Sequence, residues 1–208
     1  MPRPGRRPAI CDAAIELAAT GGTHAVTHQG VDRRLDLPRG STSYYYRTRE
    51  ALVGAAAERL VERSRERFES RMAGEPMLPG VLIADYLDEL LTERRADVFA
   101  RLALALDPSL AVGTRDALSR CFFSLPAAER LMTALSASDP RAADSRTAAD
   151  ELVTVLEGIV AAHTYGLHRR AGVGRGDLAE TVRPLVERML PISSEPPPTS
   201  GSAGPASR

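Results

Sequence analysis

Apolar residues recur through most of the chain at intervals of three and four positions, which is the spacing of a helix with one buried face. The first such stripe lies within residues 8–20 and consists of Ile10, Ala13, Ala14, Leu17 and Ala18. Gly21 and Gly22 then predict the end of this helix. Residues 81–190 show no strand-like alternation of apolar and polar positions, so the pattern predicts an all-α fold.

A tight corner between two short helices follows at residues 28–45. The first helix is predicted over residues 28–35, and Asp36 can adopt the left-handed backbone that the corner needs. The second is predicted over residues 39–45, where Pro38 is tolerated at the helix start because its missing N–H would have had no partner. This pattern predicts a helix-turn-helix whose second helix is polar, cationic and aromatic, as in proteins that read the major groove.

The same corner has a second interpretation. Two short helices joined by a turn also occur in small α-domains that bind no DNA. The run Tyr44, Tyr45, Tyr46 is also compatible with a protein core. The local pattern alone leaves both interpretations open.

Helical periodicity continues beyond this corner. One long helix is predicted from Arg49 to Met72, followed by a Gly- and Pro-containing break over residues 74–80. Further helices are predicted over residues 81–93, 96–106, 115–124, 126–137, 147–169 and 177–190. The predicted organisation is a flexible basic arm (1–7), a helix-turn-helix domain (8–55), a helical domain (56–190) and a disordered tail rich in Pro, Ser and Gly (191–208).

Charge is distributed unevenly along the chain. The net charge of the chain is zero, but residues 1–55 carry eight arginines against five acids, an excess that suits phosphate contact. The arm over residues 1–7 is either a solvated tail or a segment that reaches the DNA backbone. Two isolated cysteines favour a reducing compartment. No apolar run approaches the ~20 residues that span a bilayer, so we expect a cytoplasmic protein without a membrane partner.

No set of residues predicts an enzyme. The sequence lacks a phosphate-binding loop, a nucleophile elbow and a dinucleotide fingerprint, and neither a catalytic residue nor a cofactor is predicted. His24 and His28 stand one turn apart, but no acid or thiol completes a metal site.

A family resemblance rests on residues 10–52. Two aspartates depart from the family's pattern. Asp36 stands where the family usually has the turn glycine, and Asp32 stands where it has alanine. Further departures are Thr42 for an aliphatic residue, Ser43 for a phosphate-contacting tyrosine and Tyr45 for histidine. The matching residues are Ile10, Ala13, Ala14, Leu17, Gly21, Thr27, Val31, Leu37, Gly40, Tyr46, Arg49 and Leu52. In this stretch the chain resembles the DNA-binding domain of the tetracycline-repressor (TetR) family of transcription regulators.

Residue chemistry and this resemblance together give the expected DNA contacts. Thr27 can cap the first helix of the corner and leave its amides for phosphate. Arg39 can pair with a guanine edge, and the tyrosine hydroxyls and serines can reach bases or phosphates. The resemblance adds His28, Gln29 and Arg49, and it implies that Tyr46 is buried. The predicted contacts are Thr27, His28, Gln29, Arg39, Gly40, Ser41, Ser43, Tyr44, Tyr45 and Arg49.

The resemblance also implies roles for residues 56–190, as an effector-binding and dimerisation domain. The helices over 147–169 and 177–190 resemble those of the family's dimer interface, although the alternative that they close the core of a monomer stays open. A small-molecule pocket is implied in the same domain. Its candidate lining is Phe99, Leu102, Leu106, Phe122, Phe123, His163 and Tyr165, residues that core packing or plain helix positions explain as well.

We therefore expect a homodimeric regulator that binds a double-stranded DNA operator, acts as a repressor and responds to a small-molecule effector. Two rivals remain open. One is a helical ligand-binding or protein-interaction module whose DNA-binding head has weakened, suggested by Asp32, Asp36, Thr42 and Ser43. The other is an enzyme on a helical scaffold.

Overall fold

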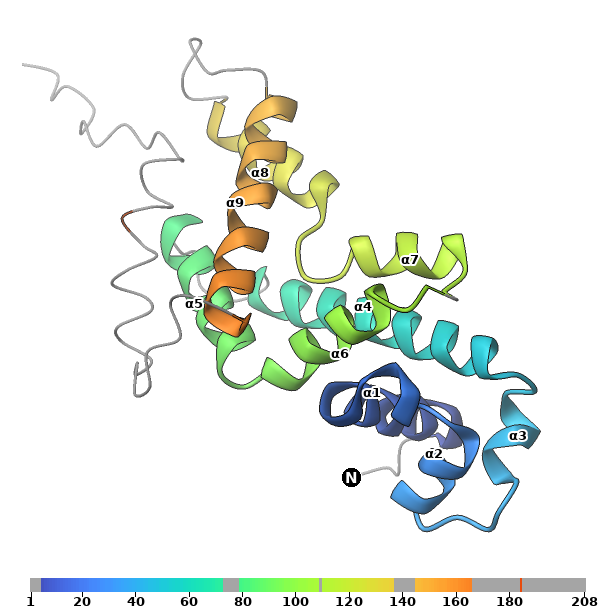
Figure 1. Cartoon of the computed structure of the whole chain (residues 1–208). Helices are drawn as coiled ribbons and strands as arrows, with labels where there is room; N and C mark the ends of the chain where they lie inside the picture. The colour runs from blue at the N-terminus through green and yellow to red at the C-terminus, as the bar shows by residue number, and fades with distance from the viewer. Residues whose placement is uncertain (1–4, 73–78, 109, 137–144, 166–183, 185–208) are drawn as a thin grey trace, which may run out of the picture.

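The computed structural model describes residues 5–72, 79–108, 110–136, 145–165 and 184. Within these ranges the chain forms nine helices and no strand, which confirms the all-α prediction (Figure 1). In chain order they are α1 Arg6–Ala25, α2 His28–Arg34, α3 Ser41–Tyr45, α4 Arg49–Met72, α5 Pro79–Leu91, α6 Arg95–Ala105, α7 Val112–Ser119, α8 Leu125–Ser136 and α9 Ser145–Tyr165. None of the described helices combines the length and the apolar character that crossing a bilayer requires. Apart from residue 184, the predicted helix over 177–190 and the tail over 191–208 lie outside the described residues.

The first helix begins earlier than its apolar stripe predicts. Arg6 and Arg7 form the first turn of α1, so they do not belong to a flexible arm. Pro8 permits this start because a first-turn N–H has no helical partner to lose. At the other end Gly22 leaves the helical conformation with φ 67° and ψ −173°, and one more turn reaches Ala25. The predicted stop at the two glycines is therefore a kink, which glycine accepts at little steric cost.

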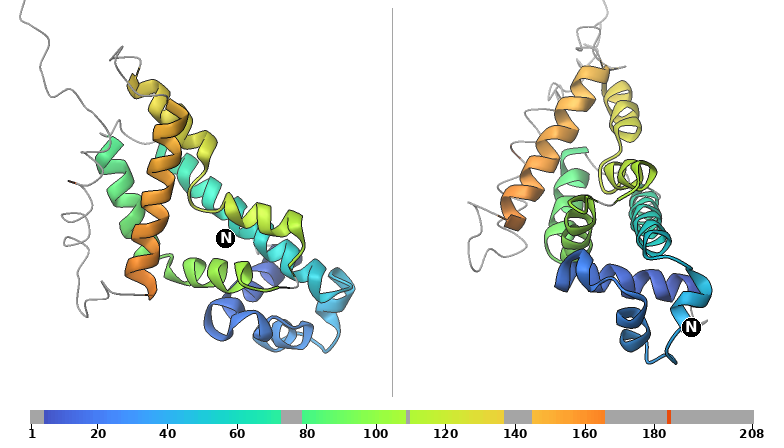
Figure 2. Two further views of the ribbon diagram at one scale, coloured as in Figure 1. Left: turned by 45° about the horizontal axis from the view of Figure 1, so that its top comes forward. Right: turned by 45° about the vertical axis from the view of Figure 1, so that its right-hand side comes forward.

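The buried surface of α1 is wider than the predicted stripe. Cys11 and Ile15 are buried outside the stripe, and Leu17 is only partly buried. The buried residues of α1 are Ile10, Cys11, Ala13, Ala14, Ile15 and Ala18. The reason is that α1 packs against α4 and α6 as well as α2. Figure 2 shows α1 lying against α6 and α4, with α2 on its other side.

The long helix α4 connects the helix-turn-helix to the remaining helices. It runs from Arg49 to Met72 as predicted, so the domain boundary proposed after residue 55 falls inside a continuous helix. Its buried apolar residues are Leu52, Val53, Ala56, Ala57 and Leu60. The helices α5 to α9 form the body of the molecule. There α4 contacts α6 and α7, and α8 and α9 pack against each other (Figure 1). The domain boundaries themselves stay predictions.

The helix predicted over residues 115–124 was wrong at its C-terminal end. α7 ends at Ser119, and Phe122 has a φ of 73°, a left-handed conformation that no helix continues through. Side chains from two other helices hold this turn. The Phe122 N–H donates to Ser64 Oγ at 3.0 Å, and the Tyr86 hydroxyl donates to the Phe122 carbonyl at 3.1 Å. Local periodicity cannot reveal such a turn, because its partners come from α4 and α5.

A buried carboxylate joins α4 to α5. Glu89 is 2% exposed and accepts hydrogen bonds from Arg67 Nε at 2.6 Å and from Arg71 Nη2 at 2.6 Å. Burial alone would raise the pKa of Glu89, but the bonds from the two guanidinium groups outweigh it, and the pKa lies below its ordinary value of 4.5. The cluster therefore stabilises the fold while Glu89 is charged.

We predict that Glu89→Gln lowers the free energy of unfolding at pH 7 by about 1.5–3 kcal/mol, because charge-assisted hydrogen bonds are lost. The contribution of Glu89 is complete above pH 4.5 and disappears as pH falls through the lower folded-state pKa, since the unfolded chain binds the proton first. Urea unfolding at several pH values should show a shallower acid loss for Glu89→Gln. The exposed Glu66→Gln serves as control, and parallel acid profiles for wild type and Glu89→Gln would contradict the prediction.

Candidate nucleic-acid interface

The start of α2 is fixed by a side-chain cap and a close approach. Thr27 Oγ1 accepts a hydrogen bond from the Gly30 N–H at 2.9 Å, so the predicted cap is confirmed. A Cβ atom on Gly30 would lie 2.8 Å from the Ala25 carbonyl oxygen, so this position needs glycine. The cap leaves Gln29 exposed on the first turn of α2.

Asp32 forms the centre of the helix-turn-helix. The residue is 3% exposed, and its two carboxylate oxygens accept three hydrogen bonds from the start of α3. Oδ2 accepts from the Gly40 N–H at 2.8 Å, and Oδ1 accepts from the Thr42 N–H at 2.8 Å and the Thr42 hydroxyl at 2.6 Å. Burial would raise the pKa of Asp32, but these bonds outweigh it and lower the pKa. A charged Asp32 thus holds α2 and α3 at their corner.

The geometry of this corner corrects the predicted start of the second helix. α3 begins at Ser41, so Pro38, Arg39 and Gly40 form the turn before it. Gly40 has a φ of 91° and nothing lies within 4 Å of a Cβ built there, so glycine is needed for its backbone conformation. Asp36 has a φ of 51°, which confirms the left-handed corner residue. Arg39 is exposed on the turn and not on the helix.

The other predicted contacts on α3 differ in exposure. Tyr44 is 78% exposed, while Tyr45 is half-buried and meets the Tyr44 ring edge-on with centroids 5.2 Å apart. The Ser41 hydroxyl donates to the Pro38 carbonyl at 2.6 Å, and Ser43 is half-buried. Tyr44 therefore offers the most accessible side chain of this helix.

His28 faces inward. Its Nε2 lies 2.7 Å from the Tyr46 carbonyl oxygen, which ties the first turn of α2 to the end of α3. The Tyr46 hydroxyl lies 3.2 Å from the Cys11 sulfur, and the ring packs against the core, as the family resemblance implies. A DNA contact by His28 would compete with its contact to Tyr46.

Arg49 also has protein partners. Its Nη2 donates to the Thr23 carbonyl at 2.7 Å and to Asp107 Oδ2 at 3.1 Å. Asp107 belongs to the turn after α6 and its side chain is 8% exposed, whereas that of Arg49 is 31% exposed. One guanidinium thus joins the end of α1 and the start of α4 to the body.

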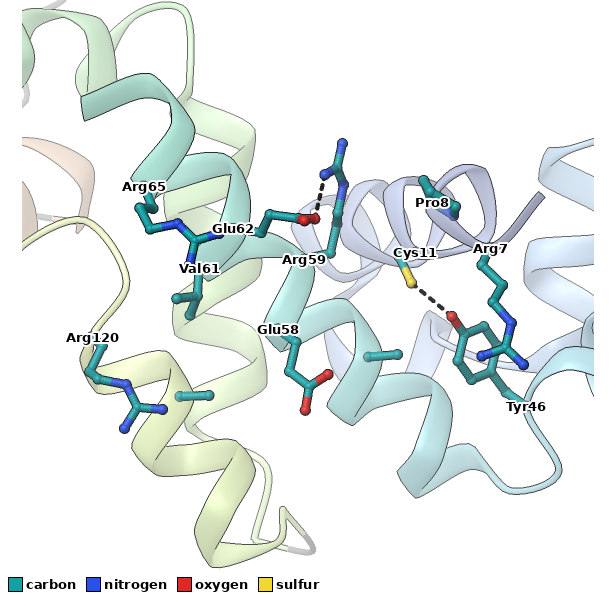
Figure 3. Close-up of a pocket in the computed structure, with 12 residues that line it drawn as sticks. Arg7, Pro8, Cys11, Tyr46, Glu58, Arg59, Val61, Glu62, Arg65 and Arg120 are labelled. Carbon is teal, nitrogen blue, oxygen red and sulfur yellow. Dashed lines mark hydrogen bonds and ion pairs between the residues drawn. The ribbon is translucent and has the colours of Figure 1, made fainter. Parts of the chain in front are cut away.

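A groove of about 430 Å³ lies between the N-terminal end of α1, α4 and α7 (Figure 3). Half of its lining residues are charged, and several of these are paired within the protein, as where Arg59 meets Asp12 and Glu62. Arg7 lies over the Tyr46 ring at 5.8 Å from its centroid. Burial raises the pKa of the Cys11 thiol, which disfavours the reactive thiolate. The groove therefore has the character of a solvated surface.

A second cavity, of about 320 Å³, lies between α6, α7 and α9. Leu102 is the predicted effector residue that lines it. Phe122 and Phe123 are buried in the core, Leu106 is 71% exposed, and Phe99 lies under the Arg95 guanidinium. His163 Nδ1 lies 2.9 Å from the carbonyl oxygen of Ile159 on its own helix, and the Tyr165 side chain lies outside the described residues. The structure does not gather the predicted effector residues into this cavity.

The sequence interpretation missed the roles of Asp32 and Thr42. It treated both as departures that weaken the head, because each replaces an apolar residue of the family pattern. An acid and a hydroxyl at two apolar positions of neighbouring helices could have indicated a bonded pair, since buried polar groups are almost always hydrogen-bonded.

We predict that Asp32→Ala and Thr42→Val are coupled. Asp32→Ala should cost about 1–3 kcal/mol of unfolding free energy, because it leaves the buried Thr42 hydroxyl and two amides without an acceptor. The double variant should be less destabilised than the sum of the two single changes, by about 0.5–3 kcal/mol, since it also removes the orphaned hydroxyl. Denaturant unfolding of the four proteins measures this coupling. Additive losses would show that the pair does not act together.

No protein-family model and no curated protein matches the sequence. Solved structures match it over most of its length. The multidrug binding protein EbrR in complex with ethidium is 25% identical, with 90% of this chain and 100% of EbrR covered and a TM-score of 0.62. A TetR-family member from Streptomyces coelicolor A3 is 26% identical over 91% of this chain and 100% of its own, with a TM-score of 0.65. A TerR/AcrR-family regulator from Aquifex aeolicus VF5 shares the fold at 17% identity, 89% and 99% coverage and a TM-score of 0.62. The fold, the helix-turn-helix and these similarities together support a transcriptional regulator of the TetR family.

Proposed function

We propose that the protein is a homodimeric, sequence-specific DNA-binding repressor that releases its operator when a small molecule binds its helical body. The observation that carries the proposal is the turn and helix held by Asp32, which expose Arg39 and Tyr44 beside the hydroxyls of α3. Arginine can donate a pair of hydrogen bonds to guanine, and a tyrosine hydroxyl can bind phosphate.

The polar pair at the corner supports an intact DNA-binding head. Asp32 and Thr42 satisfy one another, and α3 keeps its place against α2. These substitutions therefore do not favour the rival interpretation, a ligand-binding module with a weakened head. We expect two copies of the head in a dimer to place their α3 helices in successive major grooves of a near-palindromic site.

The small-molecule part of the proposal draws on similarity. Solved structures of EbrR contain ethidium, imidazole or malachite green. The cavity between α6, α7 and α9 gives this chain a place for a ligand of modest size. A ligand that prefers the DNA-free conformation weakens operator binding by its difference in affinity for the two states.

Arg49 provides a direct connection between DNA binding and the body. We propose that operator phosphate and Asp107 compete for its guanidinium, since both are anions. In the structure Arg49 donates to Asp107 and to the Thr23 carbonyl, both through Nη2. A change in the body that alters the position of Asp107 would therefore alter the availability of Arg49 for DNA.

The first test is selection of the full-length protein against randomised duplex DNA. Enrichment of a near-palindromic motif would support a dimeric sequence-specific regulator. Absence of enrichment from folded, dimeric protein would reject DNA binding and favour the ligand-binding module.

We predict that Arg39→Ala relaxes base preference at one position of each half-site, with a loss of about 1–3 kcal/mol on the preferred base. Binding to a panel of single-base operator variants measures this effect. Arg65→Ala is the matched control, because Arg65 is an exposed arginine on α4 away from the helix-turn-helix. Equal losses on every operator variant would make Arg39 a phosphate contact instead.

We also predict that Asp107→Asn strengthens operator binding, by up to about fivefold, because the amide no longer competes with phosphate for Arg49. Asp116→Asn, an exposed acid on α7, makes the same change in net charge and controls for it.

Arg49→Ala should weaken binding to all sequences and lower the salt slope by about one. In the Arg49→Ala background, Asp107→Asn should have no more effect than Asp116→Asn. Weaker binding by Asp107→Asn would mean that Asp107 positions Arg49 for DNA.

A further inference from the structure

The cavity between α6, α7 and α9 has an apolar wall and a charged edge. Val98, Leu118 and Val160 are buried apolar residues of the wall. Arg101, Arg115 and Glu157 supply the charged groups of the lining. Two guanidinium groups face one carboxylate, so the lining carries a net positive charge. The cavity is thus suited to an apolar molecule that brings one negative charge.

The pairing of these groups favours an anion over a cation. Arg101 Nη1 donates to Glu157 Oε2 at 2.6 Å, so the single carboxylate already has a cationic partner. A cationic ligand would have to displace Arg101 from Glu157. An anionic ligand would not, because the guanidinium of Arg101 has more N–H donors than its bonds to Glu157 and Leu118 use.

Contacts within the protein fix the guanidinium of Arg101 at the cavity. Its Nε donates to the Leu118 carbonyl at 3.1 Å, and its guanidinium carbon lies 5.4 Å from the centroid of the Phe122 ring. The side chain is 20% exposed, so the charge lies in a partly desolvated place where an ionic hydrogen bond is stronger than in water. A guanidinium fixed in this way loses little conformational freedom when it binds a ligand.

The second guanidinium joins the cavity to the turn that binds Arg49. Arg115 donates to the Ala105 carbonyl at 3.1 Å and to the Asp107 carbonyl at 3.4 Å. Ala105 is the last residue of α6 and Asp107 lies in the turn after it, where its side chain accepts from Arg49. An anion bound by Arg115 would draw its guanidinium toward the cavity, which would strain these two hydrogen bonds and so perturb the turn around Asp107.

We propose that this cavity is the effector site and that its effector is a compact apolar molecule with a single negative charge, such as a carboxylate, bound by Arg115 and Arg101. The proposed binding site is argued from the cavity and its lining alone. Its role as an effector site depends on the proposed repressor function. The ligand acts on DNA binding through Arg115, Asp107 and Arg49.

Three probes with one alkyl chain and different heads test the ligand class by calorimetry: octanoate, octanol and octyltrimethylammonium. Octanoate should bind at least about tenfold more tightly than the other two, because its head forms charge-assisted hydrogen bonds. Arg115→Gln should reduce octanoate to the affinity of octanol, and Glu157→Gln should increase octanoate affinity by removing a like charge. Arg120→Gln is the matched control, because Arg120 lies on the turn that ends α7 but does not line this cavity.

Preference for octyltrimethylammonium, equal affinity for all three probes or absence of binding would overturn the proposal. An unchanged octanoate affinity in Arg115→Gln would overturn it as well. DNA binding is measured separately with the selected operator. Octanoate should weaken operator binding by the wild type, and Asp107→Asn should remove this effect while octanoate still binds. Octanoate binding without an effect on operator binding would reject the relay and the effector role but keep the anion site. Operator binding without any preference for octanoate would keep the DNA-binding function but reject the anion site and, with it, the relay.

Discussion

The burial of α1 is the interaction on which the rest of the fold depends. This helix contributes its apolar side chains to the helix-turn-helix and also packs against α4 and α6. Three of its buried residues are alanines, whose size allows close approach of the neighbouring helices. Head and body therefore share one core in the described residues.

A second recurring feature of the structure is the way its arginine side chains bond two partners. Several arginines bond a backbone carbonyl and a carboxylate at the same time, as Arg49 does with Thr23 and Asp107, and Arg71 with Asp85 and Glu89. The planar guanidinium has enough donors in fixed directions for two such partners, which an ammonium group provides less well. All basic side chains of the chain are arginines, and the packing of its helices uses this property.

Periodicity was sufficient to predict where the described helices lie, although not the end of α1, the start of α3 or the end of α7. The chemistry of single residues predicted the capped start of α2 and the left-handed Asp36. Features that depend on partners distant in sequence were not predictable in this way. Phe122 turns because α4 and α5 supply its hydrogen bonds, and Cys11 is buried because α1 has neighbours on several sides. Among the DNA-contact candidates, the sequence could not show that His28 and Arg49 bond protein atoms.

The carboxylate of Asp32 has a consequence for engineering. Its partners lie in the turn and helix that would determine which operator is read, so a substitution in that segment affects the hydrogen bonds of residue 32. Replacing residues 39–45 by those of a relative with an aliphatic side chain at position 42 would remove one of the three hydrogen bonds that a buried acid accepts. A chimera designed to acquire a new operator is therefore best made by exchanging position 32 together with the helix.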